Sequence, residues 1–211
     1  MKTAMVWGAR GGIGFALTKE LLADDWHVIA VSRDVNVLGD EASLTIQADI
    51  TNANSVQDAV LSTGYEYDEV NLWIYAAGDI ISNHVDKMTP EKWQQVLGAN
   101  LTGAYMTTHF SLPLLAEDAC LVYLGAVSER LRLPGLSAYA AAKSGLESFV
   151  EALRKEQRKR RIILVRPGAV ATSFWDKVPM QLPKDAASPE KVARRILSAY
   201  FDGHKGVLDL T

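Results

Sequence analysis

Residues 4–23, AMVWGARGGIGFALTKELLA, contain the feature that decides the fold. The apolar run Ala4–Trp7 leads into a glycine-rich turn, and the helical segment Phe15–Ala23 follows that turn. In this arrangement backbone N–H groups can approach a pyrophosphate, and the N-terminus of the helix adds partial positive charge. Glycine also occurs in ordinary tight turns, but the strand before and the helix after favour dinucleotide binding. The turn residues that we assign to the nucleotide are Gly8, Arg10, Gly12, Ile13 and Gly14.

Short apolar runs alternate with helical patterns along the rest of the chain. Residues 146–153 place apolar side chains at i, i+3, i+4 and i+7, as on one face of a helix, and Ser188-Pro189 suits another helix start. Such alternation predicts a parallel sheet with helices on both faces. We therefore expect one Rossmann-like, doubly wound α/β domain over residues 1–211, with a sheet of roughly seven strands. The further predicted strands are Val28–Val31, Leu44–Ile46, Leu72–Ala76, Leu121–Leu124, Ile162–Val165 and Val207–Leu210.

Composition and charge argue against several classes of protein. The net charge of -3 gives no general affinity for nucleic acid, and no apolar run approaches the length of a membrane span. The histidines lie far apart and lack the spacing of metal ligands, so we predict no metal site. The single cysteine, Cys120, cannot form a disulfide within the chain. No secretory signal is recognisable before the first strand, so we expect a cytoplasmic protein without nucleic-acid or membrane partners.

A basic run near residue 160 has two interpretations. It could bind nucleic acid, or it could be the solvated end of a helix, where cations interact favourably with the helix dipole. The nearly balanced charge of the whole chain favours the helix end. The residues of this run are Arg154, Lys155, Arg158, Lys159, Arg160 and Arg161.

The end of the second predicted strand bears on the choice between NAD and NADP. An acid there would bind the ribose 2′-hydroxyl, whereas a base accommodates a 2′-phosphate. This chain has Ser32-Arg33 and no acid before Asp34. The guanidinium groups of Arg33 and Arg10 can form forked hydrogen bonds to a phosphate. We therefore predict NADP(H) rather than NAD(H); the alternative is that both arginines are ordinary surface residues.

Tyr139 and Lys143 form the candidate catalytic pair. The spacing i, i+4 places both side chains on one face of the helix that follows the fifth strand. An ammonium near the phenol favours the phenolate, so we expect the tyrosine pKa to fall from about 10 towards neutral pH. Tyr139 is therefore a candidate general acid or base.

Together these motifs resemble the short-chain dehydrogenase/reductase family over nearly the whole chain. Gly8-x-x-x-Gly12-Ile13-Gly14 is similar to the glycine pattern of the common short form of that family. The resemblance implies that Tyr139 is the acid/base and that Lys143 binds the nicotinamide ribose and tunes Tyr139. It also implies that Asn100, in Asn100-Leu-Thr-Gly103, supports a proton path to the lysine. The further cofactor contacts that it implies are Asp49 and Ile50 at the adenine, Ala77 and Gly78, and then Pro167, Gly168, Val170 and Thr172 at the nicotinamide carboxamide.

One departure from the family pattern affects the chemistry. The catalytic serine of the family normally lies in a Ser-Ser pair after the fifth strand, and counting back from Tyr139 places Gly125-Ala126 there. Loss of one hydrogen-bond donor where negative charge develops on oxygen typically costs about 10²–10³ in rate. Ser128 lies two residues further on, either as a substitute donor or as an ordinary loop serine.

The segment 124–126, with Trp7 before the glycine turn, is locally similar to dihydropteridine reductase, which has an alanine at the serine position. The quinonoid substrate of that enzyme spreads incoming charge over a conjugated ring, so a dedicated oxyanion donor matters less. The similarity is only local, because Asn100 and residues 167–172 follow the common short form and Arg33 is unlike an NADH-specific relative. A pteridine- or quinone-like acceptor is therefore one hypothesis for the substrate.

The irregular stretch Ser173–Ser188 is the expected substrate loop. Long loops in compact domains are often functional lids, although a surface loop with its own packing is the alternative. Its apolar residues, which include Met180 and Leu182, suggest a partly hydrophobic ligand. The residues that we assign to the substrate are Ala126, Ser128, Phe174 and Trp175.

The sequence thus predicts an oxidoreductase that transfers hydride between NADP(H) and a small carbonyl or conjugated substrate, with Tyr139 as general acid/base. The alternative is an NADP(H)-binding sensor or scaffold that lost its activity together with the catalytic serine. A domain for another nucleotide is a third interpretation, which the combined motifs disfavour. The family resemblance further implies a homodimer or homotetramer, formed through the helices that begin near Asn100 and Tyr139.

Overall fold

The computed structural model describes residues 1–35, 42–178 and 180–211 and places one seven-stranded sheet at the centre of that part of the chain. The strand order is β3-β2-β1-β4-β5-β6-β7, and every pairing is parallel. The direction of strand addition therefore reverses between β1 and β4, which confirms the predicted doubly wound α/β fold. The strands are β1 (Thr3–Trp7), β2 (His27–Ser32), β3 (Leu44–Gln47), β4 (Val70–Tyr75), β5 (Leu115–Leu124), β6 (Arg161–Pro167) and β7 (Gly206–Leu210).

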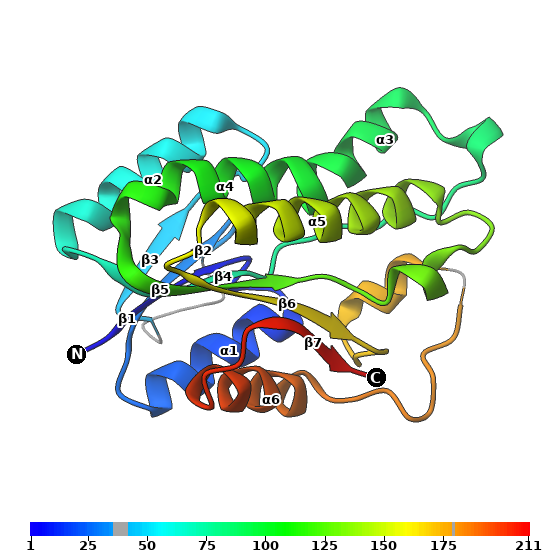
Figure 1. The fold of residues 1–211 in the computed structure, drawn as a ribbon. Coiled ribbons are helices and arrows are strands. Elements are labelled where there is room, and N and C mark those ends of the chain that lie inside the picture. The colour runs from blue at the N-terminus through cyan, green and yellow to red at the C-terminus, as the bar shows by residue number, and fades with distance from the viewer. Residues whose placement is uncertain (36–41, 179) are drawn as a thin grey trace.

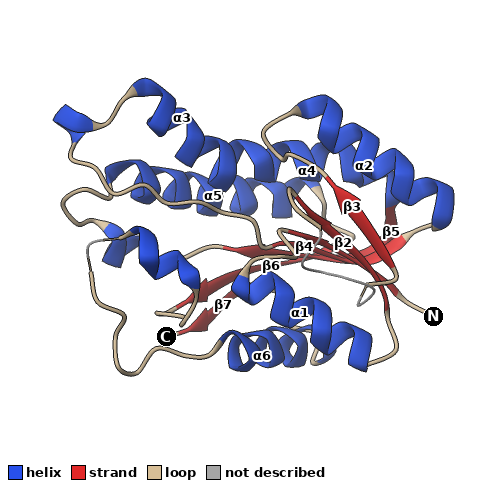
Figure 2. Ribbon diagram, turned by 180° about the vertical axis from the view of Figure 1, so that it is seen from behind, coloured by secondary structure: helices blue, strands red, loops and turns tan. Residues whose placement is uncertain are grey.

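Helices cover both faces of the sheet (Figure 1). One face carries α1 and α6, the other carries α2, α4 and α5, and Figure 2 shows the same two layers from behind. Leu17 and Leu21 of α1 join one apolar core, and Leu146 and Val150 of α5 join the other. The helices are α1 (Gly12–Ala23), α2 (Ala53–Glu66), α3 (Pro90–Leu97), α4 (Gly103–Ser111), α5 (Ser137–Glu156) and α6 (Pro189–Phe201).

Strand β4 shows how side chains divide between the two cores. Leu72 and Ile74 face the core beneath α1 and α6, whereas Trp73 and Tyr75 face the core beneath α2, α4 and α5. This alternation follows from the two-residue period of a strand. The indole N–H of Trp73 donates a hydrogen bond of 3.0 Å to the hydroxyl of Ser111, so the polar atom of this fully buried ring is satisfied.

The ends of the helices follow from local capping. The Ser188 hydroxyl accepts a hydrogen bond from the backbone N–H of Lys191, and Pro189 occupies the first turn, as the sequence predicts for α6. Helix α1 begins at Gly12, three residues before the predicted start at Phe15, because the glycine turn itself enters the helix. No helix in the described residues is both long enough and apolar enough to cross a membrane.

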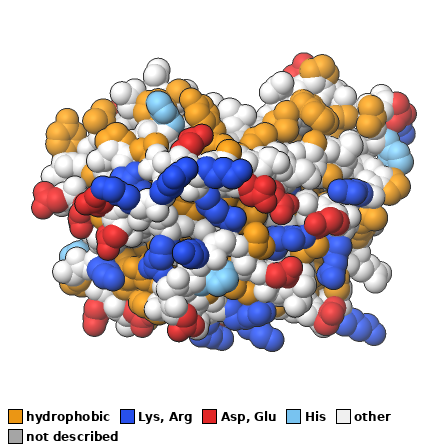
Figure 3. All heavy atoms as spheres, in the orientation of Figure 1, with side chains coloured by type: hydrophobic (Ala, Val, Ile, Leu, Met, Phe, Trp, Pro, Cys, Tyr) orange, Lys and Arg blue, Asp and Glu red, His pale blue; other side chains and the backbone are white. Residues whose placement is uncertain are grey.

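The basic run spans the end of α5 and the start of β6 and is only partly solvated, which corrects the prediction of a solvated helix end. Arg160 donates hydrogen bonds to the carbonyl oxygens of Leu115 and Ala116. Arg161 donates to the carbonyl oxygen of Tyr200 at the end of α6. These two cations therefore join neighbouring elements. Figure 3 shows acidic and basic side chains interspersed over the face seen in Figure 1.

Ser111→Ala tests the packing of the core beneath α4. The substitution leaves the Trp73 indole N–H buried without a partner, which costs about 1–3 kcal/mol of the free energy of unfolding. Urea denaturation of the two proteins measures this difference. Ser198→Ala is the matched control, because the Ser198 hydroxyl donates to Asp202 in an exposed hydrogen bond. Such surface substitutions change the free energy of unfolding by about 0.5 kcal/mol at most. An equal loss of unfolding free energy in both variants would show that the hydrogen bond from Trp73 to Ser111 does not stabilise the core.

Candidate functional site

A cavity of about 840 Å³ opens at the carboxyl edge of the sheet, beside the loops that leave β1, β4, β5 and β6. Its volume suits a bound small molecule, and open α/β sheets bind ligands where the strand order reverses. Among the residues assigned from the sequence, Gly14 and Ser128 do not line this cavity. Those that line it are Gly8, Arg10, Gly12, Ile13, Arg33, Asp49, Ile50, Ala77, Gly78, Asn100, Ala126, Tyr139, Lys143, Pro167, Gly168, Val170, Thr172, Phe174 and Trp175.

Two close approaches explain the glycines of the turn after β1. Gly8 has a φ of +86°, and a Cβ there would lie 2.6 Å from the backbone nitrogen of Ala77. A Cβ on Gly12 would lie 2.4 Å from the methyl group of Thr172. Both glycines are therefore required, because side chains would collide with the segments that follow β4 and β6. The turn thus brings these segments together at one wall of the cavity.

The first turn of α1 is open to an anion. Gly11 caps the helix without a side-chain hydrogen bond, and no acidic residue lies in the first turn. The helix therefore keeps backbone N–H donors and partial positive charge at the cavity wall. Arg33 also lines the cavity, and Arg10 forms a 2.8 Å ion pair with Asp34, a partner that the sequence analysis did not assign to it.

The carboxylate of Asp49 is held in a fixed position at the cavity wall. It accepts a hydrogen bond of 2.9 Å from the backbone N–H of Thr51 and one of 2.7 Å from the Thr51 hydroxyl. The backbone hydrogen bond from Thr51 lowers the pKa of Asp49, so the carboxylate stays ionised. Among the described residues, no group of three or more His, Cys, Asp or Glu side chains could hold a metal ion.

Tyr139 and Lys143 meet the cavity from the first two turns of α5, and both are buried. The Lys143 ammonium donates a 2.8 Å hydrogen bond to the carbonyl oxygen of Leu124 and lies 5.7 Å from the centre of the Tyr139 ring. Burial raises the pKa of Tyr139 and lowers that of Lys143 to about 8. The predicted fall of the tyrosine pKa is therefore wrong for this structure, since burial penalises the phenolate and the ammonium is directed at Leu124.

Asn100 is placed by a π-helical turn, Gly98–Thr102, between α3 and α4. Such turns often occur at functional sites. The Tyr75 hydroxyl at the end of β4 donates to the carbonyl oxygen of Ala99 and so anchors the turn to the sheet. The Asn100 amide nitrogen donates to the carbonyl oxygens of Val96 and Asp79, whereas its buried Oδ1 has no hydrogen-bond partner.

The free Oδ1 of Asn100 and the Lys143 ammonium both lie close to Gly78. A Cβ built on Gly78 would lie 2.9 Å from this oxygen and 3.9 Å from the Lys143 ammonium, so both atoms face the same small space. Because both amide protons are occupied, the orientation of the Asn100 side chain is fixed. A buried acceptor beside an ammonium can hold a bridging water, which is the role that the family resemblance implies for this residue.

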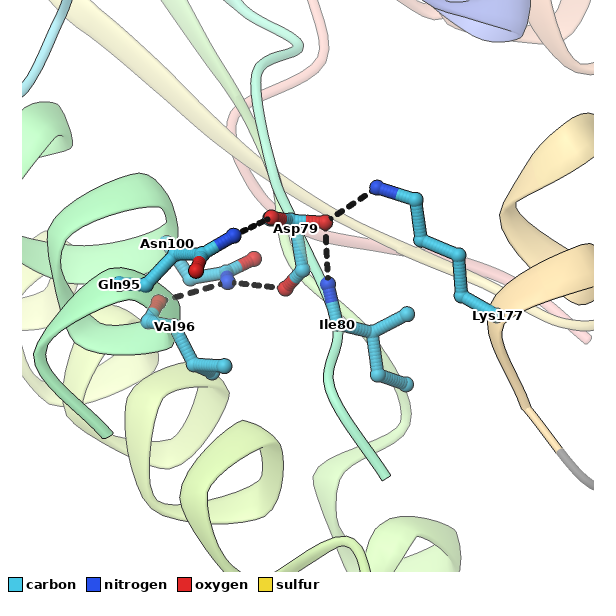
Figure 4. A network of polar contacts seen from close by, with 6 residues as sticks. All are labelled: Asp79, Ile80, Gln95, Val96, Asn100 and Lys177. Atoms are coloured by element: carbon cyan, nitrogen blue, oxygen red, sulfur yellow. Dashed lines mark hydrogen bonds and ion pairs between the residues drawn. The ribbon is translucent and has the colours of Figure 1, made fainter. Parts of the chain in front are cut away.

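Asp79, a buried acidic residue that was not predicted from the sequence, bonds to several segments of this region (Figure 4). The Asp79 carboxylate accepts hydrogen bonds from the backbone N–H of Ile80, from Gln95 and from Lys177. Burial opposes ionisation, but the hydrogen bonds from Lys177 and Gln95 outweigh it and lower the pKa of Asp79. The available signal was a charged residue directly after Gly78, a few residues beyond the end of a buried strand.

The substrate-loop region contains more regular structure than predicted. Residue 179 lies outside the described residues. The region begins with a short 3-10 helix, η6 (Ser173–Lys177), and Ala187 forms a β-bridge with Val170. The Phe174 ring packs at 5.5 Å from the Tyr139 ring. The Trp175 indole donates to the carbonyl oxygen of Val170.

Ser128 does not replace the missing serine. Its hydroxyl is buried and donates a 3.0 Å hydrogen bond to the carboxylate of Glu147. Ser128 is therefore an ordinary structural serine, and its assignment to the substrate is corrected. Ala126 lines the cavity and offers no hydroxyl there.

The chain belongs to the short-chain dehydrogenase family, because the family model for short chain dehydrogenase matches residues 2–182. A carbonyl reductase family member 4 from Xenopus tropicalis is 28% identical over 99% of this chain and 96% of its own length. A 3-oxoacyl-[acyl-carrier-protein] reductase from Synechocystis is 28% identical over 84% of this chain and 77% of its own length. The protein is therefore an oxidoreductase of this family.

Solved structures show the same fold. The alcohol dehydrogenase of Thermococcus sibiricus, in complex with 5-hydroxy-NADP, superposes with a TM-score of 0.91 at 22% identity, covering 100% of this chain and 96% of the other. The aldohexose dehydrogenase of Thermoplasma acidophilum superposes with a TM-score of 0.87 at 20% identity, covering 99% of this chain and 91% of the other.

The lowered pKa of Lys143 makes a prediction about stability. The folded protein releases this proton near a pKa of about 8, whereas an unfolded lysine keeps it to about 10.4. Between these values the unfolded chain binds more protons, so rising pH stabilises the wild type relative to Lys143→Met by at most about 1.4 kcal/mol per pH unit. Urea denaturation of both proteins without cofactor measures the difference, and a difference that stays constant across this window contradicts the assignment.

Proposed function

We propose that the protein is an NADP(H)-dependent reductase of a small carbonyl or conjugated compound, with Tyr139 as the general acid. The observation that supports the proposal is the meeting of Tyr139, Lys143 and Asn100 in one cavity with the glycine turn. This set combines a proton donor, a buried cation and a nucleotide-binding wall. A protein that only binds a nucleotide has no need for a buried phenol at the same place.

The residues of the cavity fit a dinucleotide. The N-terminus of α1 would hold the pyrophosphate, and Arg33 together with Arg10 would hold a 2′-phosphate. Asp49 would contact the adenosine, and Lys143 would bind the nicotinamide ribose. When bound, the reduced nicotinamide supplies the hydride. The open first turn of α1 supports this assignment, because backbone donors facing a cavity suit an anion.

Tyr139 is suited to donate a proton. Burial raises the pKa of its phenol, so the group stays protonated at neutral pH. As hydride reaches the substrate carbon, the phenol O–H bond breaks and the proton moves to the substrate oxygen or nitrogen. Lys143, with a pKa of about 8, is mostly charged at neutral pH and stabilises the phenolate that remains.

Ala126 favours a substrate that disperses charge. A simple ketone concentrates negative charge on one oxygen, where a missing donor costs about 10²–10³ in rate. A conjugated acceptor, such as a quinone or a quinonoid dihydropterin, spreads that charge over a ring. The rings of Phe174 and Trp175 line the same cavity and suit a flat, partly apolar ligand.

Tyr139→Phe tests the catalytic assignment. NADPH oxidation is followed at 340 nm with diketones, quinones and quinonoid dihydropterin as acceptors. We expect wild-type turnover on a conjugated acceptor and a loss of about 10²–10⁴ in kcat for the variant, which is the range for general acid catalysis. The dissociation constant for NADPH should change little, because the rest of the cavity wall is retained.

Two results would count against the proposal. Equal turnover in wild type and Tyr139→Phe would remove the phenol from the chemistry. Tight NADPH binding without turnover on any acceptor would favour the alternative, a sensor or scaffold that binds the cofactor.

Arg33→Ser tests the choice of cofactor. Loss of a charge-assisted hydrogen bond to a 2′-phosphate weakens binding by about 1.5–3 kcal/mol, or about 10- to 150-fold. We therefore expect weaker binding of NADPH and unchanged binding of NADH, measured by fluorescence titration. Arg158→Ser, which removes an exposed arginine far from the cavity lining, is the control. An equal loss for both nucleotides after Arg33→Ser would rule out a 2′-phosphate site there.

A further inference from the structure

An ion pair joins the substrate loop to the segment that follows β4. Lys177 is the last residue of η6, and Asp79 lies 98 residues earlier in the chain, directly after Gly78. The lysine ammonium is 2.6 Å from Asp79 Oδ1 (Figure 4). Figure 4 shows the Lys177 side chain extending from its helix towards the carboxylate, across the space between the two segments.

The Asp79 carboxylate depends on this cation. The residue is 5% exposed, and its other partners, the backbone N–H of Ile80 and the amide of Gln95, are neutral. In the described part of the chain, Lys177 supplies the ion pair that Asp79 makes. A buried carboxylate without its counter-charge is unfavourable, so the pair biases the loop towards the position in which Lys177 reaches Asp79.

The same aspartate also orients Asn100. Its backbone carbonyl oxygen accepts a 2.6 Å hydrogen bond from the Asn100 amide, and the free Asn100 Oδ1 lies beside Gly78, as does the Lys143 ammonium. One residue therefore has its side chain bonded to the substrate loop and its backbone bonded to the polar group beside the candidate catalytic lysine. Movement of Asp79 would displace both contacts together.

The loop around Lys177 covers the candidate acid. Phe174, three residues earlier, packs on the Tyr139 ring, and Val178 joins the same apolar cluster. Lys177 itself lines the cavity, and its side chain remains about half exposed to solvent. The exposed Lys177 side chain can therefore leave the buried Asp79 carboxylate without displacing core side chains.

We propose that Lys177 is a positioning residue, whose ion pair with Asp79 holds the loop closed over Tyr139 and keeps Asn100 aligned. It acts through Phe174 and Asn100 and does not touch the reacting atoms. Substrate entry and product release then require the pair to open. The catalytic part of this inference rests on the proposed function, whereas the closure of the loop does not.

Hydrogen–deuterium exchange tests the closure without any need for activity. Peptides across residues 173–188 are compared in wild type, Lys177→Met and Lys184→Met. Lys184 is the matched control, because it is an exposed lysine of the same loop and makes no ion pair in the described structure. We expect exchange about twofold to fivefold faster in Lys177→Met, the effect of losing one partly exposed ion pair.

Three further results should accompany that change. Lys177→Arg should restore the slow exchange, because it keeps the charge. The double variant Asp79→Asn/Lys177→Met should exchange no faster than the faster single variant, since both changes break one contact. Added salt should speed exchange in the wild type and have little effect in Lys177→Met.

Kinetics then tests the positioning role. Under the proposed function, Lys177→Met raises the KM for the acceptor and lowers kcat, Lys177→Arg restores both, and the dissociation constant for NADPH is unchanged. Unchanged exchange in Lys177→Met would overturn the loop closure, whether or not any acceptor is turned over. Faster exchange with wild-type kcat and KM would overturn the positioning role and leave a structural ion pair only.

Discussion

The close approach of Gly8 to the backbone of Ala77 is the contact on which the site depends. A Cβ at residue 8 would lie within 2.6 Å of the Ala77 nitrogen, so no other residue allows the two loops to lie so close. Because every strand is parallel, these loops leave the same edge of the sheet, at the reversal of strand order. The glycine turn, the end of β4 and the start of α5 therefore enclose one cavity.

Burial then determines the chemistry of that cavity. The two groups on α5 respond in opposite ways, because an apolar environment disfavours both the phenolate of Tyr139 and the ammonium of Lys143. The result is a phenol that holds its proton at neutral pH beside a lysine whose pKa is about 8. Proton donation, with transient stabilisation of the phenolate by the lysine, is the chemistry that this pair supports best.

The sequence was sufficient for the features that arise from local patterns. Short apolar runs predicted all strands of the sheet, and the glycine turn together with Tyr139 and Lys143 identified the elements that line the cavity. It failed where the outcome depends on partners distant in the chain. The direction of the Tyr139 pKa shift depends on burial in the folded protein. The hydrogen bond from Ser128 to Glu147 is not predicted by any pattern in the sequence. The contact between Asp79 and Lys177 likewise joins two segments that no periodicity relates.

We propose that hydride transfer from NADPH in this cavity is coupled to proton donation by Tyr139. The most direct test uses NADPH carrying deuterium at the transferable position of the nicotinamide, with mass spectrometry of the products from a panel of conjugated acceptors. We expect a wild-type product that gains one deuterium, and a Tyr139→Phe protein that binds the nucleotide but forms almost none of this product. Full nucleotide binding with no deuterium in any product of the wild type would contradict the proposal.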